Sequence, residues 1–346
     1  MTDEAQERVR RVLVIGAYGA LGSLTAEAFR RAGWSVLAGT RRRSTAADVR
    51  HVDLDEPATV DAALTDVDAV INTVPDGALR AERAVLRRGG VLVNLSALPA
   101  AAGRGLRSEV AHPRGTVLMN AGLAPGLTNL VAADLLAAHP EADEVEMVFT
   151  ISVAGTAGPA AADFAHRGLT AMHRHRTVRV PLPAPFGDRR CLGFAEPDGG
   201  WLETGPHGPA VSTYVCFAGP AVHRLMLGLN IARAISHLPR ALLRAGSTKP
   251  GTPPSREPVA HWIAVRRDGR RIAARTVEGH GDFLLAAATT PMFTDALLGR
   301  RHRGPAAPGL WNPEELLPLP ALSSALAEAG VRVTEQQLQP VKSTAA

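Results

Sequence analysis

Three glycines near the start of the chain allow a phosphate group to approach the backbone. Gly16, Gly19 and Gly22 follow the apolar run 12–15 with the spacing G-x-x-G-x-x-G, and an amphipathic segment, 23–32, comes directly after them. This order predicts a buried strand, a tight turn and a helix whose free N–H groups and positive dipole end face the turn. Because glycine has no side chain, the backbone can approach a pyrophosphate there.

We therefore expect a dinucleotide at this turn, and with it redox chemistry. The alternative is a glycine turn with a purely structural role. The expected contacts are Gly16, Tyr18, Gly19, Ala20, Leu21 and Gly22.

The arginines after the second predicted strand indicate which dinucleotide binds. The strand, at 34–40, ends in Arg41, Arg42 and Arg43. In a dinucleotide-binding fold this strand end lies beside the adenosine ribose, where an acid binds the 2′-hydroxyl of NAD and an arginine suits the 2′-phosphate of NADP. Since three arginines and no acid stand here, we expect NADP (NADPH) rather than NAD, held by Arg41 and Arg42. A solvated basic turn is the alternative.

Three further predicted strands supply the rest of the expected cofactor site. They are predicted at 51–55, 68–75 and 91–96. In doubly wound sheets, ligands bind just outside the carboxyl ends of the strands. The residues expected there are Asp53, near the adenine, Thr73, Val74 and Pro75, along the cofactor, and Ser96, toward the nicotinamide.

A second turn is expected to face the cofactor. A strand at 116–120 is followed by two glycines on either side of a proline, and then by a helix that runs to residue 138. We expect Gly122 to contact the cofactor, and Asn120 and Thr128 to take part in catalysis; alternatively, Gly122 only shapes a turn. The residues expected to line the reacting carbon are Ser96, Asn120, Gly122, Pro125 and Thr128.

A proton donor is expected on a helix predicted at 160–174. Asp163 and His166 lie three residues apart and share a face, and His173 lies near them two turns further on. This pair suits a general acid, His166, oriented by the carboxylate of Asp163, or else a plain polar face. A metal site of His166, His173 and His175 is less favoured because His175 falls off the shared face, and we expect no metal.

The elements that position these residues alternate between strands and helices up to about residue 140. This alternation predicts an α/β class with a Rossmann doubly wound parallel sheet. From residue 144 the pattern changes to strands at 145–153, 211–217, 259–266 and 271–277, with a hairpin signal at Asp268–Gly269. The second half is therefore expected to be an α+β domain with a mostly antiparallel sheet.

The order and spacing of these motifs resemble those of the saccharopine dehydrogenase-like NAD(P)-dependent reductases. The segments that carry the resemblance are 12–22, 68–75, 122–127 and 308–315, the last of which is similar to the family's closing P-G-x-x-x-P-E segment. The resemblance implies three parts: a Rossmann domain at 1–125, an inserted substrate-binding and dimerisation domain at 126–290, and a C-terminal segment at 291–346 that returns to the first domain.

The resemblance also implies reduction of an imine with NAD(P)H, or the reverse oxidation of an amine, on a small-molecule substrate. Relatives often carry a Cys before a G-x-x-Y-x-D stretch, whereas residues 86–95 lack the Cys and have Asn94 in place of the usual aspartate. This departure favours a specialised biosynthetic reductase over a lysine-pathway enzyme. A carbonyl or enoyl reductase and a non-catalytic NADP-binding redox sensor are the alternatives, and the large second domain favours an enzyme.

Composition bounds the remaining properties. A chain of 346 residues is long enough for two domains, and its two cysteines, Cys191 and Cys216, cannot form a disulfide framework. The excess of 38 Lys+Arg over 33 Asp+Glu contains no dominant basic block, so we expect no nucleic-acid partner. With a polar N-terminus and no apolar run long enough to span a membrane, the chain is expected to be cytoplasmic, and a homodimer is favoured.

A basic amphipathic segment at 221–245 admits three interpretations. On a helical wheel His223 and Asn230 fall on the polar side, with several arginines, and Leu225 and Leu229 fall mainly on the other. The favoured interpretation is a helix that covers a core and exposes its polar side to water. A surface for a membrane or partner, and a lid over an apolar substrate, are the alternatives.

Overall fold

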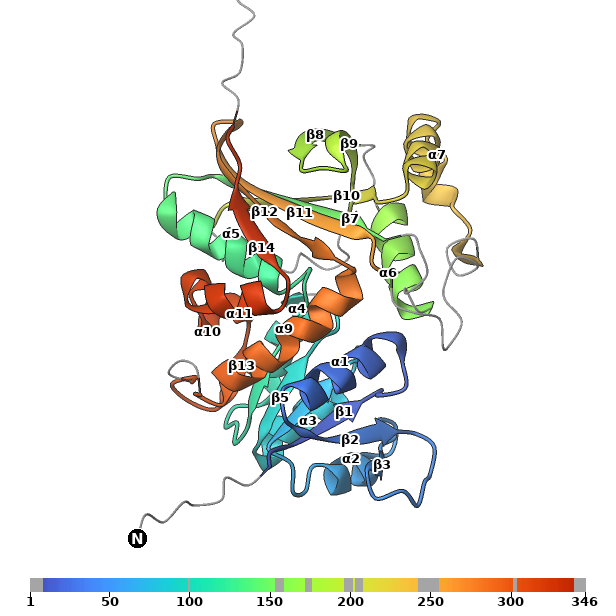
Figure 1. Ribbon diagram of the computed structural model, residues 1–346, viewed down its shortest axis with the longest axis vertical. Coiled ribbons are helices and arrows are strands. Elements are labelled where there is room, and N and C mark those ends of the chain that lie inside the picture. The colour runs from blue at the N-terminus through green and yellow to red at the C-terminus, as the bar shows by residue number, and fades with distance from the viewer. Residues whose placement is uncertain are drawn as a thin grey trace, which may run out of the picture. The chain divides into compact units, whose positions relative to one another are not determined.

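The computed structural model describes residues 9–98, 100–152, 159–171, 176–195, 202, 208–241, 255–300 and 304–338. The chain divides into two compact units (Figure 1). The first is Met1–Leu123 with Ala286–Leu317, and the second is Ala124–Leu285 with Pro318–Ala346. Each unit thus contains two separate stretches of the chain.

In the described part of the first unit, seven parallel strands form a sheet in the order β13-β6-β5-β4-β1-β2-β3. The strands are β1 (Arg11–Ile15), β2 (Ser35–Thr40), β3 (Val49–His51), β4 (Ala69–Asn72), β5 (Val91–Asn94), β6 (Thr116–Leu118) and β13 (Gly309–Trp311). The helices are α1 (Ala20–Arg31), α2 (Pro57–Ala63), α3 (Arg80–Arg88), α4 (Ala100–Glu109), α10 (Pro313–Leu316) and α9 (Asp282–Leu297), which begins in the second unit. The strand order from β3 to β6 is that of a Rossmann sheet, which confirms the predicted class.

The first strand forms because it is apolar on both of its faces. All four residues of 12–15 are buried, as expected of a parallel strand covered by helices on each side. Leu13 and Ile15 pack with Val60 of α2, Val85 of α3 and Leu106 of α4. Since successive side chains alternate and the crossovers are right-handed, the even-numbered residues of β1 face the side on which α1 packs.

Two predicted boundaries in this unit were wrong. The first helix begins at Ala20 rather than at residue 23, because Gly19 already has the extended conformation of an N-cap. The third strand ends at His51 rather than at residue 55. Asp53 lies in the turn that follows, where its N–H bonds to the hydroxyl of Thr59 at 2.9 Å and its carboxylate accepts the N–H of Asp55 at 3.0 Å.

In the described part of the second unit, seven strands form a mixed sheet in the order β14-β12-β11-β7-β10-β9-β8. The strands are β7 (Glu144–Ile151), β8 (Thr177–Leu182), β9 (Gly187–Gly193), β10 (Ala210–Phe217), β11 (Pro258–Arg267), β12 (Arg270–His280) and β14 (Arg332–Glu335). All of these neighbours pair antiparallel except β7 and β10. The predicted mostly antiparallel sheet is therefore confirmed, as is its hairpin at Asp268 and Gly269, whose φ angles are +48° and +73°.

Helices pack on the second sheet, and one buried carboxylate forms ion pairs within it. The helices are α5 (Leu127–Ala138), α6 (Pro159–Thr170), α7 (Pro220–Ile231), α11 (Ser323–Glu328) and the 3-10 helices η1 (Ile235–His237) and η2 (Leu319–Leu322). Of these, α5 packs on β11 and β12. Glu146 of β7 is fully buried and pairs with Arg271 at 2.8 Å and with Arg266 at 3.6 Å. No helix in the described residues is long and apolar enough to cross a membrane.

The orientation predicted for the 221–245 segment was wrong over α7. This helix buries His223 and Asn230 and leaves Leu225 exposed by 54%. The imidazole of His223 accepts the N–H of Phe217 at 3.4 Å, so a polar contact with the end of β10 decides which side faces inward. Residues 242–245 lie outside the described residues.

The packing of α3 against the loop before β6 gives a stability prediction. A Cβ at Gly115 would lie 2.2 Å from the carbonyl oxygen of Val85 and 3.0 Å from that of Gly90, so Gly115→Ala must shift the backbone. We expect a loss of about 1–3 kcal/mol in the free energy of unfolding. Gly105→Ala, on an open part of α4, is the control and should be neutral or stabilising by up to about 1 kcal/mol. Urea unfolding of both variants measures the difference, and equal midpoints would contradict the prediction.

Candidate functional site

The glycine turn between β1 and α1 has the geometry of a close backbone approach. Gly16 has φ +81°, and a Cβ there would lie 2.7 Å from Cγ2 of Val74 and 2.8 Å from Oγ1 of Thr73. A Cβ at Gly22 would lie 2.0 Å from the carbonyl oxygen of Gly16, so α1 packs against the turn only because this residue is glycine. The first glycine makes the turn, and the third allows the helix to approach the strand.

The N-terminus of α1 presents backbone donors that the helix itself does not use. The N–H of Gly19 bonds to the carbonyl of Gly16 at 2.8 Å, and the helical ladder starts with the N–H of Ser23 on Gly19 at 2.9 Å. The N–H groups of Ala20, Leu21 and Gly22 precede that ladder, and no side chain caps them. With no acid in the first turn of α1, these donors and the helix dipole fit an anionic group such as a pyrophosphate.

The end of β2 lies beside this turn and carries free positive charge. The N–H of Gly16 bonds to the carbonyl of Gly39 at 3.0 Å, which fixes the turn against β2. Arg41, Arg42 and Arg43 come directly after Thr40, the last residue of β2, and all three are exposed. None of their guanidinium groups forms an ion pair within the described part of the chain. The positive charges of these arginines are therefore available to bind a phosphate at this strand end.

The turn after β4 borders the glycine turn. The hydroxyl of Thr73 donates to the carbonyl of Ile15 at 2.8 Å, so this side chain fastens the end of β4 to the end of β1. Val74 is half-buried, and its Cγ2 lies 2.7 Å from the place that a Cβ at Gly16 would take. Pro75 is exposed. The structure thus brings together Gly16, Thr73 and Val74, three of the residues expected to contact the cofactor.

The polar residues expected near the reacting carbon have different surroundings. Asn120 has φ +52°, and its side-chain oxygen accepts the N–H of Leu98 at 2.9 Å, so it joins the ends of β6 and β5. The hydroxyl of Ser96 is buried and has no hydrogen-bond partner within the described residues. Gly122 is buried in the first unit, whereas Thr128 is fully buried near the start of α5 in the second unit.

The acid–base pair expected on α6 is not formed by the contacts that the structure describes. The carboxylate of Asp163 accepts hydrogen bonds from Nε and Nη2 of Arg240, at 2.7 and 2.6 Å. Nε2 of His166 lies 2.8 Å from the carbonyl oxygen of Leu238. These contacts fasten α6 to the segment after η1.

Of the three histidines of the less favoured metal site, the structure describes His166 alone. His173 and His175 lie outside the described residues. Within the described residues, no group of three His, Cys, Asp or Glu side chains is placed to hold a metal ion.

Sequence reasoning missed a buried polar cluster at the ends of β4 and β5. Glu82 of α3 is fully buried and accepts hydrogen bonds from the amides of Asn72, at 2.8 Å, and Asn94, at 2.6 Å. The signal was present in α3, because Glu82 lies three and four residues before the apolar Val85 and Leu86 and so shares their face. A carboxylate on the apolar face of a helix indicates a buried partner.

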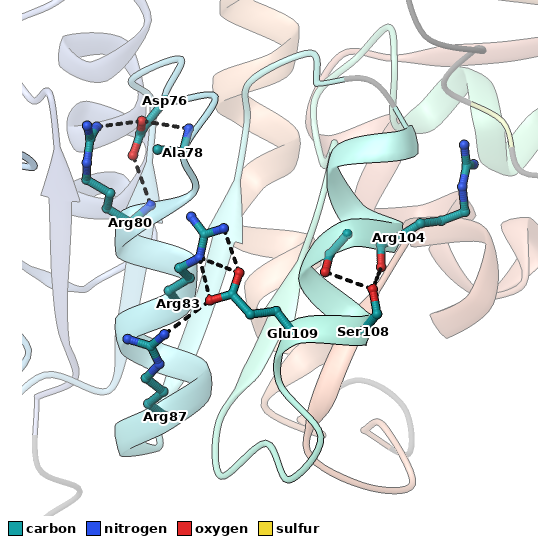
Figure 2. A network of polar contacts seen from close by, with 9 residues as sticks. Asp76, Ala78, Arg80, Arg83, Arg87, Arg104, Ser108 and Glu109 are labelled. Carbon is teal, nitrogen blue, oxygen red and sulfur yellow. Dashed lines mark hydrogen bonds and ion pairs between the residues drawn. The ribbon is translucent and has the colours of Figure 1, made fainter.

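Ionic contacts fix the position of α3 (Figure 2). Asp76 accepts the N–H groups of Ala78 and Arg80, at 3.0 and 2.9 Å, and the guanidinium of Arg80 at 2.9 Å. Glu109 of α4 accepts hydrogen bonds from Arg83 and Arg87 of α3, and the bonds from Arg83 hold its pKa below the ordinary value. The helix that carries Glu82 is thus anchored at its start and along its exposed side.

Comparison with known proteins agrees with this geometry. Residues 12–103 match the NAD dependent epimerase/dehydratase family. The structure of saccharopine dehydrogenase (L-Glu forming) from Saccharomyces cerevisiae matches 95% of this chain and 100% of its own, with 13% identity and a TM-score of 0.55. A short-chain dehydrogenase from Burkholderia cenocepacia in complex with NADP matches 32% of this chain and 70% of its own, with 23% identity and a TM-score of 0.25. No curated protein matches the chain in sequence.

The match to saccharopine dehydrogenase defines the class of fold. This chain shares that fold over nearly its whole length, which confirms the resemblance seen in the motifs. The match of residues 12–103 covers the glycine turn and the strands around it, and it supports the expectation of an oxidoreductase with a nicotinamide cofactor.

The close approach at Gly22 predicts a loss of nucleotide binding on substitution. Gly22→Ala places a methyl group 2.0 Å from the carbonyl of Gly16, so α1 must move away from the turn. We expect the Kd for NADPH to rise at least about tenfold, the equivalent of about 1.4 kcal/mol. Gly228→Ala, at an open position in α7, is the matched helical control and should leave the Kd unchanged. Fluorescence titration measures both, and an unchanged Kd for Gly22→Ala would show that the phosphates bind elsewhere.

Proposed function

We propose that this protein is an NADPH-dependent reductase that reduces the C=N bond of an imine on a small molecule, or oxidises the corresponding amine. The observation that carries the proposal is the glycine turn. No side chain caps the first N–H groups of α1, and α1 packs close to the turn because Gly16 and Gly22 have no side chains. The saccharopine dehydrogenase fold supports an amine or imine as the reacting group.

The choice of NADPH rests on the end of β2. Arg41 and Arg42 are exposed and free of described ion pairs, and Thr40 fixes the backbone between them by accepting the N–H of Arg42 at 3.2 Å. A guanidinium binds a phosphate with two charge-assisted hydrogen bonds. NADH has a single uncharged hydroxyl in place of the 2′-phosphate, and this hydroxyl cannot form both bonds.

The protein's part in the reaction is to bind, orient and exclude water. A bound nicotinamide supplies the hydride. The turns at Val74 and Ser96 hold its surroundings rigid. The hydroxyl of Ser96, which is buried and has no partner within the described residues, is a donor for a polar group of cofactor or substrate. Orientation of this kind accounts for as much as about 7–11 kcal/mol of a barrier between two bound reactants.

The proton that accompanies the hydride needs a donor, which is a side chain or water. We propose His166 for this role, since its ring is half-buried on α6 and one of its nitrogens, Nδ1, is not used by the contact with Leu238. Asp163 forms an ion pair with Arg240.

An assay with separate carbonyl and amine components tests the reaction class. We expect NADPH to be consumed when a carbonyl compound and an amine are supplied together, because only the mixture contains an imine. The disappearance of reduced nicotinamide is followed by absorbance, and the secondary amine formed is identified by mass spectrometry. Consumption with the carbonyl compound alone, at the same rate, would instead indicate a carbonyl reductase.

Reversal of one charge at the end of β2 tests the cofactor preference. Arg42→Asp should raise the Kd for NADPH by about 10- to 100-fold, because a charge-assisted hydrogen bond is lost and a repulsion gained, and should leave the Kd for NADH nearly unchanged. Arg270→Asp, at an exposed arginine of the second unit, is the control. Equal weakening of both cofactors, or of neither, would contradict the assignment of this strand end to the 2′-phosphate.

A further inference from the structure

One buried carboxyl group links the carboxyl ends of two neighbouring strands. Asn72 and Asn94 are the last residues of β4 and β5 and lie opposite each other in the sheet. Both side-chain amides donate to the same oxygen, Oε1 of Glu82, at 2.8 and 2.6 Å. Glu82 is 0% exposed, so water does not compete for these hydrogen bonds.

The carboxyl also determines which group each amide oxygen contacts. An asparagine side chain offers donors on its nitrogen and an acceptor on its oxygen. Because Glu82 takes the nitrogen side of both amides, each oxygen is turned to the backbone two residues further on. Asn72 Oδ1 accepts the N–H of Val74 at 3.0 Å, and Asn94 Oδ1 accepts the N–H of Ser96 at 2.6 Å. One carboxyl therefore fixes two turns on adjacent strands.

This arrangement costs free energy that apolar packing would not cost. Burial raises the pKa of Glu82, and the hydrogen bonds from Asn72 and Asn94 act against that rise without cancelling it. Its second oxygen, Oε2, has no hydrogen-bond partner within the described residues. A leucine would fill this face of α3 next to Val85 and Leu86 without a desolvation cost, so packing does not account for the carboxyl.

We propose that Glu82 is a positioning residue for the nicotinamide half of the cofactor site, an inference that rests on the proposed function. In this strand order β2 and β3 lie on one side of β1, where the adenosine half binds, and β4 and β5 lie on the other. The two turns that Glu82 holds, at Val74 and Ser96, therefore border the nicotinamide half. The hydroxyl of Ser96, buried and without a partner among the described residues, is the group that the network holds in place for the ligand.

Two substitutions at position 82 separate this role from plain packing. Glu82→Met removes the acceptor of both amides and keeps the length of the side chain. Glu82→Gln keeps one oxygen, which can accept from both amides in the place of Oε1, and puts its nitrogen in the place of Oε2. A role in filling space predicts that Glu82→Met is tolerated.

The probes are NADPH and adenosine 2′,5′-bisphosphate, which lacks the nicotinamide half. We expect Glu82→Met to raise the Kd for NADPH about tenfold, and Glu82→Gln to keep it within about twofold of the wild type. The Kd for adenosine 2′,5′-bisphosphate should stay constant in all variants, which also shows that the first unit is folded. Glu328→Gln, at an exposed carboxylate of α11 in the second unit, is the control and should change neither Kd.

The outcomes distinguish this inference from the proposed function. If the wild type binds NADPH but Glu82→Met binds it equally well, if Glu82→Met weakens both probes equally, or if Glu82→Gln binds NADPH as weakly as Glu82→Met, Glu82 has no positioning role and the proposed function stands. If the wild type binds neither NADPH nor adenosine 2′,5′-bisphosphate, the proposed function and this inference fail together.

Discussion

The first unit depends on the space that two glycines leave between β1 and α1. A Cβ at Gly22 would meet the carbonyl of Gly16 at 2.0 Å, and one at Gly16 would meet Val74 and Thr73. The helix can therefore begin close to the strand, with its first N–H groups free, only while both positions lack side chains. The bond from Thr73 to the carbonyl of Ile15 then brings β4 against the same turn, so the loops of adjacent strands meet at one edge of the sheet.

A second constraint is the satisfaction of polar groups where the strands end. The strands β4 and β5 end in asparagines whose amides are held by Glu82, and Asn120, just after β6, bonds to the N–H of Leu98. Each asparagine thus replaces a backbone hydrogen bond that the sheet can no longer supply. The same contacts make the turns rigid, which links the stability of the first unit to the shape of its ligand site.

The second unit uses its polar residues mainly for structure. Asp163 pairs with Arg240, His166 contacts Leu238, and Glu146 is neutralised by Arg271 and Arg266 inside the sheet. On α7 the buried His223 decides which side of the helix faces inward, at the expense of the exposed Leu225. Spacing along a helix shows which residues share a face, but it does not show which neighbouring groups lie opposite that face.

The sequence alone determined the class of fold, the strand that begins the site and the glycine turn, because these depend on local properties: apolar runs, glycine spacing and turn signals such as Asp268–Gly269. It did not determine the partners of polar side chains. Glu82 and Asn94 are 12 residues apart, Asp163 and Arg240 are 77 apart, and only the tertiary structure brings each pair into contact. A side chain's hydrogen bonds depend on what the folded chain places within about 3 Å of it, and for distant residues that is set by the packing of whole elements.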